Sequence, residues 1–441
     1  MKLIYAILAI CLFLVGCKSH TIENIDIKID PAYLNADFKQ ITSNIEGRVP
    51  NPYYLCSKVS YDSVKKNISS SLNSSMTVIE FYQKMAPIFS LLKDGHFQFF
   101  IDEKLVDKLE RENPDLYFPF TVFIDGNKIF VNKNLTDNTG IKSGDEILSI
   151  NEVSSRMILN RLRYGVSLKT NEENYFERRH ESHFYRSILL DMGFRNSFKV
   201  KFKDKTVKVR GISAKKIKMI NEPPNDFVYK ILNGKTKIGY LQVNTLLSSK
   251  RQKLDSCLTV FFKLLEQEKI NKLIIDIRNN LGGSTKLSRD IFDYITQKKY
   301  LIDLGDEYLK DSKPTFDNDT TLSVPRQMPD KFYGKTILLT NVISYSSAHM
   351  MANTFKYYKM GIVIGQVSVE PLFISGEVEE LITVNTKSNV YFPTSDFYLP
   401  GYKKDNISYF VPDYQVYPTI NDRIKSKDEA LNFAVKLLGL N

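Results

Sequence analysis

The feature that most constrains the fold is a regular alternation of strand-like and helix-like segments in the second half of the chain. Strands are expected at residues 238–243, 272–277, 336–340 and 362–364, and helices at residues 249–268, 286–296 and 348–359. The end of the chain is more β-like, at residues 381–392 and 407–417, before a last helix at residues 428–438. Alternation of this kind is typical of parallel strands joined by helical crossovers. We therefore expect an α/β fold with a largely parallel sheet in residues 226–441.

The chain is also long enough for more than one domain. Its 441 residues exceed what a single ordinary hydrophobic core accommodates. Residues 17–111 carry a mainly helical pattern, most clearly at residues 34–46 and 76–93. Residues 112–213 are rich in β signals and begin with a hairpin whose turn lies at residues 125–127. We therefore expect a multidomain protein with a helical N-terminal domain, a β-rich second domain and an α/β third domain.

The N-terminus has the features of an export signal. Thirteen apolar residues, 3–15, follow Lys2 and precede Gly16 and Cys17. This run is too short to span a bilayer but fits the apolar region of a signal peptide. Residues 14–17 resemble a bacterial lipobox, which implies a signal peptide of residues 1–16, cleavage before Cys17 and lipid attachment to its thiol. The expected location is a bacterial membrane, with the body facing the periplasm or the cell surface. The alternative is a plain signal peptide with a chance cysteine.

Cysteine usage and charge restrict the possible partners. Besides Cys11 and Cys17 the chain has only Cys56 and Cys257. These two could pair in an oxidising compartment, but Cys257 lies in a helix-like apolar stretch where buried free thiols are common, so no disulfide is expected. The net charge of +11 comes from 61 Lys and Arg and 50 Asp and Glu residues scattered along the chain. Scattered charges are typical of solvated faces, and no nucleic-acid partner is expected.

Two polar turns of the α/β region have residues suited to catalysis. Adjacent Gly282 and Gly283 follow the expected strand 272–277, where they allow a sharp turn and bring N–H groups close to a substrate carbonyl. A serine pair, Ser346 and Ser347, stands at the entry of the helix after the strand 336–340. A hydroxyl at such a turn lies beside the unpaired N–H groups of the first helical turn, which stabilise an oxyanion. The alternatives are a simple glycine turn and a serine that only caps the helix.

The order of these motifs resembles one family. The segments IGYLQV, DIRNNLGG and SYSSA resemble the catalytic core of the tail-specific, or C-terminal-processing, serine peptidases. The segment GDEILSIN, residues 144–151, resembles a PDZ domain, and residues 94–96, DGH, resemble an element of the tricorn-like branch of that family. The resemblance implies a crotonase-like peptidase core in residues 226–441 and a PDZ-like domain in residues 112–213. PDZ domains bind extended peptides by adding a strand to a sheet edge.

The resemblance also implies roles for particular residues. Ser347 matches the nucleophile and His96 the general base, while Gly282 or Gly283 together with the backbone N–H of Ala348 would form the oxyanion hole. Imidazole suits the role of base because its reference pKa is about 6.5.

A histidine base is needed because the lysine used by the other branch is absent. The place of that lysine is held by Pro371. The other histidines fit less well: His20 lies beside the expected anchor, and the side chain of His349 diverges from that of Ser347 along the helix. His180 and His183 have a spacing that can hold a metal, but no third ligand accompanies them, so no metal is expected.

The third catalytic residue should be a carboxylate that orients the imidazole. The family pattern places an acid shortly before the segment of residues 408–413, and Asp405 is the nearest match, with Asp413 as the fallback. Either acid could instead be an ordinary loop residue.

Together these features predict a lipid-anchored periplasmic serine endopeptidase. It would hydrolyse extended or C-terminal segments of proteins through an acyl-enzyme at Ser347, with no metal or organic cofactor. Two glutamates usual in the family are missing, one of them at the position of Met350. These departures leave open a catalytically inactive, peptide-binding lipoprotein of the same fold. A weaker alternative is a basic surface protein that binds an anionic polymer.

Overall fold

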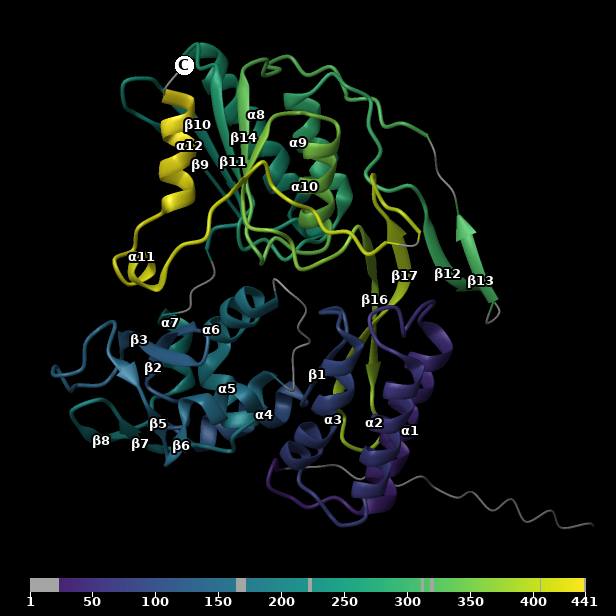
Figure 1. The fold of residues 1–441 in the computed structure, drawn as a ribbon, viewed down its shortest axis with the longest axis vertical. Coiled ribbons are helices and arrows are strands. Elements are labelled where there is room, and N and C mark those ends of the chain that lie inside the picture. The colour runs from purple at the N-terminus through teal and green to yellow at the C-terminus, as the bar shows by residue number, and fades with distance from the viewer. Residues whose placement is uncertain are drawn as a thin grey trace, which may run out of the picture.

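The computed structural model describes residues 24–163, 172–220, 224–310, 313–317, 321–404 and 406–439. These residues form three units, an N-terminal helical unit, a middle unit and a C-terminal α/β unit (Figure 1). The expected signal peptide and Cys17 lie outside the described residues. The multidomain α/β class predicted from the sequence is confirmed.

The α/β unit contains a six-stranded sheet. The strand order is β18-β15-β14-β11-β10-β9, with bounds Tyr414–Gln415, Ile362–Gly365, Lys335–Leu339, Lys272–Asp276, Ile238–Val243 and Phe227–Leu232. Every pair from β10 to β18 is parallel, and only β9 runs antiparallel to its neighbour. The largely parallel sheet is therefore confirmed. The carboxyl ends of β11 and β14 lie side by side, so the loops after them, which carry the glycine pair and the serine pair, meet at one edge.

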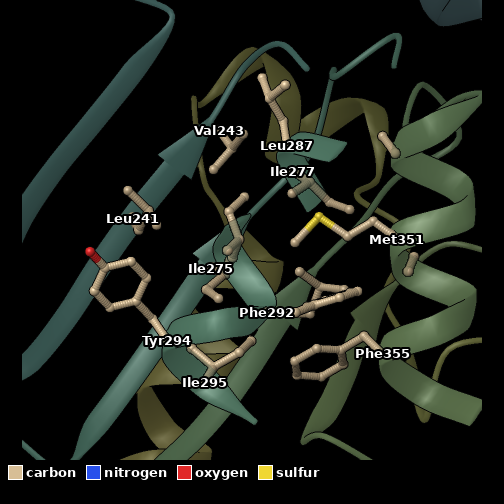
Figure 2. Close-up of a cluster of buried hydrophobic side chains, with 14 of the residues drawn as sticks. Leu241, Val243, Ile275, Ile277, Leu287, Phe292, Tyr294, Ile295, Met351 and Phe355 are labelled. Carbon is tan, nitrogen blue, oxygen red and sulfur yellow. The ribbon is translucent and has the colours of Figure 1, made fainter. Parts of the chain in front are cut away.

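Alternate residues of these strands build two hydrophobic layers. On one face Leu241, Val243 and Ile275 pack against helices α8 (Arg251–Gln267), α9 (Thr285–Ile295) and α10 (Ser347–Tyr357). Figure 2 shows this layer, including Phe292, Met351 and Phe355. On the other face Tyr240 and Ile274 pack against helix α12 (Glu429–Gly439). Each fully buried aliphatic or aromatic side chain contributes about 1.5–3 kcal/mol, so this double layer fixes the loops above it.

The N-terminal unit consists of α1 (Pro31–Arg48), α2 (Lys58–Ser71), α3 (Val78–Leu92), strand β1 (Gln98–Phe100) and α4 (Glu103–Glu112). The capping box of Thr77 and Glu80 begins α3, as expected from the helix signal there. Helix α3 ends at Lys93, which adopts a left-handed conformation with φ 59°. The chain then turns through residues 94–97 into β1, which places His96 on a short turn between helix and strand.

A long hairpin from the C-terminal third completes the N-terminal unit. Strands β16 (Phe373–Ile382) and β17 (Asn389–Tyr398) extend from the α/β unit toward the N-terminal helices (Figure 1). β1 pairs with the first residues of β17, and β12 (Asp306–Lys310) and β13 (Lys313–Asp317) extend the same sheet. Val390 and Phe392 are fully buried in the core formed by α1 to α4. The core of the N-terminal unit thus includes residues from beyond position 111.

The middle unit has a separate hydrophobic core built on two small sheets. The first contains β2 (Phe120–Asp125), β3 (Lys128–Asn134) and β4 (Glu146–Ile147), which confirms the predicted hairpin. The second contains β6 (Val153–Ser154), β5 (Ser149–Ile150), β7 (Ser197–Lys201) and β8 (Thr206–Arg210). The helices are α5 (Ser155–Arg163), α6 (Glu172–Leu190) and α7 (Ala214–Ile220). Helix α6 lies along β2 and reaches toward the other two units (Figure 1).

The structure also bears on membrane-spanning helices and on the pairing of the two cysteines in the described residues. Within the described ranges no helix has both the length and the apolar character needed to cross a bilayer. Cys56 and Cys257 are both free thiols, and they lie against different hydrophobic cores. Burial raises the pKa of both, that of Cys257 to about 11, so both remain protonated and unreactive at neutral pH.

Candidate active site

The serine turn between β14 and α10 has an unusual backbone conformation. Ser346 has φ 52° and ψ −127°, a combination that costs a residue with a side chain about 1–3 kcal/mol. The turn is held by Ser344 Oγ, which donates to the Ile277 carbonyl at 2.9 Å, and by the N–H of Tyr345, which donates to the Asn280 carbonyl at 2.9 Å. The partly exposed Ser346 side chain makes no capping hydrogen bond to the helix. The strain therefore presents a free hydroxyl at a sharp strand-to-helix turn, as in nucleophile elbows.

Ser347 has a different environment. It is the first residue of α10 and is only 5% exposed. Its Oγ donates to the Gly283 carbonyl at 2.8 Å, which ties the helix entry to the glycine loop. Its hydroxyl proton is thus used in a structural bond. The sequence analysis chose Ser347 as the nucleophile, but this geometry favours its neighbour Ser346.

The His96 side chain is oriented by a carboxylate two residues earlier. Its Nδ1 lies 2.7 Å from Asp94 Oδ1, and its backbone N–H donates to the same oxygen at 2.8 Å. Because an ionised carboxylate only accepts hydrogen bonds, this contact assigns a proton to Nδ1. The opposite atom, Nε2, is buried and has no hydrogen-bond partner among the described residues. A neutral His96 therefore presents an unused lone pair, as a general base requires.

Tyr345 joins the histidine turn to the serine turn. Its hydroxyl accepts from the Gly95 N–H at 2.9 Å and donates to Asp94 Oδ1 at 3.2 Å. Its ring centroid lies 5.1 Å from that of His96. Because Tyr345 directly precedes Ser346, these bonds hold two segments about 250 residues apart in sequence against each other. Within the described residues no hydrogen bond joins the imidazole to either serine.

A buried glutamate that the sequence analysis did not select completes the cluster. Glu370 is 5% exposed, and its carboxylate accepts the N–H of Ser346. Burial raises the pKa of Glu370 to about 8, against the opposing effect of nearby His96. The only sequence signal was its position beside Pro371, where the other branch of the family has a lysine.

Burial and charge act in opposite directions on the pKa of His96. Burial lowers it, but the charge of Asp94 and the hydrogen bond from Nδ1 raise it, and the net direction is upward. Burial also raises the pKa of Asp94, yet the imidazole outweighs it and holds that pKa below its ordinary value. The two groups therefore stabilise each other as an ion pair when the imidazole accepts a proton.

The predicted oxyanion donors are mostly engaged within the protein. The N–H of Gly282 donates to Asn280 Oδ1 at 2.8 Å, and the N–H of Ala348 donates to the Tyr345 carbonyl at 3.0 Å. The N–H of Gly283 has no partner among the described residues. Gly282 has φ 98°, and a Cβ there would lie 2.8 Å from Ser346 Cβ, so only glycine allows the loop to approach the serine turn this closely.

The two acids considered as the third catalytic residue have different outcomes in the structure. Asp405 lies outside the described residues. Asp413 accepts from the Val363 N–H at 2.8 Å and pairs with Lys356 at 2.9 Å, so its carboxylate stabilises the end of β15 and α10. Asp94 instead occupies the position on Nδ1 that an orienting acid must have.

The remaining histidines have structural surroundings. Burial lowers the pKa of His349 to about 4, and its Nε2 lies 3.1 Å from the Pro371 carbonyl. Burial likewise lowers the pKa of His180 to about 3. Among the residues that the structure describes, no group of three His, Cys, Asp or Glu side chains is arranged to hold a metal ion.

A cavity of about 130 Å³ lies beside this cluster, where Asp94, Tyr345 and Glu370 line it but His96 and the two serines do not. All three units contribute to its wall, with Asp94 and Gly95 from the N-terminal unit, Tyr175 and Arg179 from α6, and residues 369–375 from the α/β unit. The Tyr175 and Tyr345 rings stack with centroids 5.8 Å apart. Formation of the site therefore requires the three units to be assembled.

Comparison with known proteins gives one family match and several structural matches. Residues 237–416 match the model of peptidase family S41. No curated protein sequence matches the chain. The structure is similar to mature CPAF at 14% identity, covering 92% of this chain and 96% of that chain with a TM-score of 0.65. CPAF complexed with lactacystin matches at 14% identity, with 92% and 97% covered and a TM-score of 0.64. The photosystem II D1 C-terminal processing protease matches at 12% identity, with 88% and 93% covered and a TM-score of 0.46. The likeness to CPAF shows a shared fold.

Proposed function

We propose that this protein is a serine endopeptidase that cleaves extended or C-terminal segments of proteins, because residues 237–416 match the model of peptidase family S41. The observation that carries the proposal is the contact made by Tyr345. Its hydroxyl binds the turn that orients His96, and its backbone leads directly into the strained Ser346. The turn that carries the proposed base and the turn that carries the proposed nucleophile are thereby joined through one side chain.

In the proposed reaction Ser346 Oγ attacks the carbonyl carbon of the scissile peptide bond. His96 Nε2 takes the hydroxyl proton, and Asp94 stabilises the imidazolium through Nδ1. The imidazolium then gives its proton to the leaving amine, which leaves an acyl-enzyme on Ser346. Water, deprotonated by the same nitrogen, hydrolyses the ester and restores the serine.

The resting geometry requires a rearrangement before this reaction. Nε2 has no bond to the serine, and the Gly283 N–H is the one predicted oxyanion donor without a partner among the described residues. Catalytic hydrogen bonds are often loose before substrate binds and tighten in the complex. A substrate carbonyl that accepts from Gly283 would bring its carbon to the serine turn.

Substitution of the two serines tests the assignment of the nucleophile. We expect Ser346→Ala to abolish both peptide hydrolysis and covalent labelling by a serine-directed phosphonate. Ser347→Ala, the matched control, should keep labelling with reduced activity because only its bond to Gly283 is lost. His96→Ala should lower kcat by roughly three or more orders of magnitude. Labelling of Ser346→Ala at the wild-type rate would refute the assignment, and loss of labelling in Ser347→Ala alone would transfer the role to Ser347.

We also propose that Cys17 anchors the mature protein to a bacterial membrane through lipid, with the body in the periplasm or at the cell surface. The support is the sequence of residues 14–17 after the apolar run. In cells fed labelled palmitate, the wild type and Cys56→Ser should incorporate label and sediment with membranes. Cys17→Ser should do neither. Equal label in all three proteins would exclude this anchor.

A second candidate is a peptide-binding lipoprotein without turnover. The engagement of the Gly282 and Ala348 N–H groups inside the protein favours it. It predicts peptide affinity that is the same in the wild type, Ser346→Ala and His96→Ala, with no hydrolysis or phosphonate labelling of any of them.

A further inference from the structure

A groove of about 1510 Å³ lies between the N-terminal and middle units. One wall is a sheet face, because register places Gln98 opposite Tyr391 and Tyr391 opposite Glu380, and all three side chains line the groove. The other wall is formed by α4 and by the second half of α6. We call this space the α6 groove.

The α6 groove adjoins the candidate active site. Phe89, Phe97, Gln98 and Arg179 line both the groove and the smaller cavity at Asp94 and Glu370. Phe97 and Gln98 directly follow His96 in the chain. A ligand that fills the groove therefore lies next to the histidine turn.

Two arginines of α6 that line the groove have no ion pair, unlike several other arginines of the protein. Arg163, Arg251 and Arg278 each pair with at least one carboxylate. Among the described residues, Arg179 and Arg186 of α6 have no ion pair, and the buried Nε of Arg186 has no hydrogen-bond partner. Buried donors without partners are rare in native proteins and suggest that a ligand supplies the acceptor.

Two of the carboxylates that line the groove are already engaged. Asp102 accepts from the Lys104 N–H at the start of α4, and Glu380 accepts from the Tyr391 hydroxyl at 2.6 Å. Glu103, Asp107 and Asp191 also line the groove, but none of them forms an ion pair with Arg179. The guanidinium of Arg179, between the groove and the candidate active site, is therefore a favourable position for an added negative charge.

The free side of β2, a sheet edge of the middle unit where a strand could add, is occupied by side chains. The Ile124 N–H donates to Glu181 Oε1 at 2.5 Å, and the Gly126 N–H donates to Glu177 Oε1 at 2.7 Å. Arg423 Nη1 donates to the Ile124 carbonyl at 3.1 Å. A peptide cannot pair with β2 at these positions without displacing charged side chains. By contrast, β1 pairs only with β17 within the described ranges and stands at the end of its sheet, beside the α6 groove.

We propose that the α6 groove binds the substrate as an extended peptide with an acidic side chain, and that Arg179 is the residue that selects this side chain. The inference rests on the proposed peptidase function and names the substrate class for that site. The extended form follows from the free edge of β1 beside the groove, and the acidic side chain follows from the unpaired arginine.

The test compares internally quenched peptides that differ by a single Glu or Gln placed at successive positions. At one position the wild type should cleave the Glu peptide with a kcat/KM roughly tenfold to hundredfold higher, the size expected for a charge-assisted hydrogen bond. Arg179→Gln should reduce this ratio to about one, and Arg179→Lys should retain part of it. Arg156→Gln, at an exposed arginine of α5 outside the groove, should leave the ratio unchanged. The absence of any Glu preference in the wild type, or its persistence in Arg179→Gln, would overturn the proposal.

Binding to the full-length Ser346→Ala protein separates this inference from the proposed function. Fluorescence anisotropy with the same Glu and Gln peptides measures affinity without turnover. If the Glu peptide binds more tightly, Arg179→Gln removes the difference and the wild type hydrolyses nothing, the groove assignment stands and the peptidase proposal fails. If the wild type hydrolyses both peptides equally, the peptidase proposal stands and the groove assignment fails. If the peptides are neither bound nor hydrolysed, both proposals are rejected.

Discussion

At the scale of residues, the candidate site is a cluster of buried acids around one imidazole. Asp94 and Glu370 both influence His96, and Asp396, fully buried nearby, accepts from Ser375 Oγ at 2.9 Å. Burial raises the pKa of Asp396 to about 7. Several negative charges in so small a volume would repel one another, so the raised pKa values keep some of these carboxyls protonated near neutral pH. The stability of the protein is therefore coupled to the state of its active site.

Glu370→Gln should reveal this coupling as a stability that depends on pH. The pKa of Glu370 is raised to about 8 in the folded protein, above the ordinary value of 4.5. Such a carboxyl contributes stability that is fully present below its unfolded pKa and is lost as the pH rises through its folded pKa. Glutamine cannot ionise, so the variant does not lose this stability. The free energy of unfolding of the variant minus that of the wild type should therefore rise by about 1–3 kcal/mol between pH 5 and pH 8.

Urea denaturation at several pH values measures this difference. Glu152→Gln, at an exposed residue of the middle unit, serves as the control and should track the wild type across the range. A gap between Glu370→Gln and the wild type that stays constant or narrows with rising pH would contradict the expectation.

The sequence predicted several of the residues that lie in the candidate site, but it predicted the role of each residue less well. The motif at residues 94–96 and the serine pair were found because each stands at a turn between regular elements. The sequence alone does not distinguish Ser346 from Ser347. The structure distinguishes them by the positive φ of Ser346 and by the hydrogen bond from Ser347 to Gly283. Glu370 has no local signature, since its importance arises from a contact with a backbone N–H 24 positions away.

At the scale of elements, periodic segments with local signals were predicted well. Strands β10 and β11 and helices α8 to α10 lie close to their expected positions because their apolar spacing and their capping residues are local properties. Residues 407–417, in contrast, contribute only the short strand β18 (Tyr414–Gln415). The predicted strand at residues 381–392 is divided by a turn at residues 383–388, which is held in part by Asp37 of α1. Contacts that distant in sequence leave no periodic pattern to detect.

At the scale of the whole molecule, the C-terminal hairpin joins the first and last parts of the chain. Phe392 of β17 is fully buried among the N-terminal helices, and the Arg48 guanidinium of α1 lies 5.2 Å from its ring centroid. Phe392→Ala should therefore destabilise the N-terminal unit by about 3–5 kcal/mol, the usual cost of removing a buried aromatic ring. Amide hydrogen exchange should accelerate in α1 and α3.

Phe316→Ala provides the comparison for this substitution. Phe316 lies on β13 of the same sheet but is 53% exposed, so its removal should change stability by less than about 0.5 kcal/mol. If Phe392→Ala leaves exchange in α1 and α3 at the wild-type rate, the hairpin does not stabilise the N-terminal unit.

The position of this hairpin has a consequence for biogenesis. A polypeptide is synthesised and exported from its N-terminus, so α1 to α4 emerge well before the residues of β17 that complete their interior. His96 lies between α3 and β1, and in the part of the chain that the structure describes β17 is the one strand that pairs with β1. The proposed base, His96, therefore reaches its native surroundings only when most of the chain has been translated. In the proposed peptidase this order delays hydrolysis until the newborn protein is nearly whole.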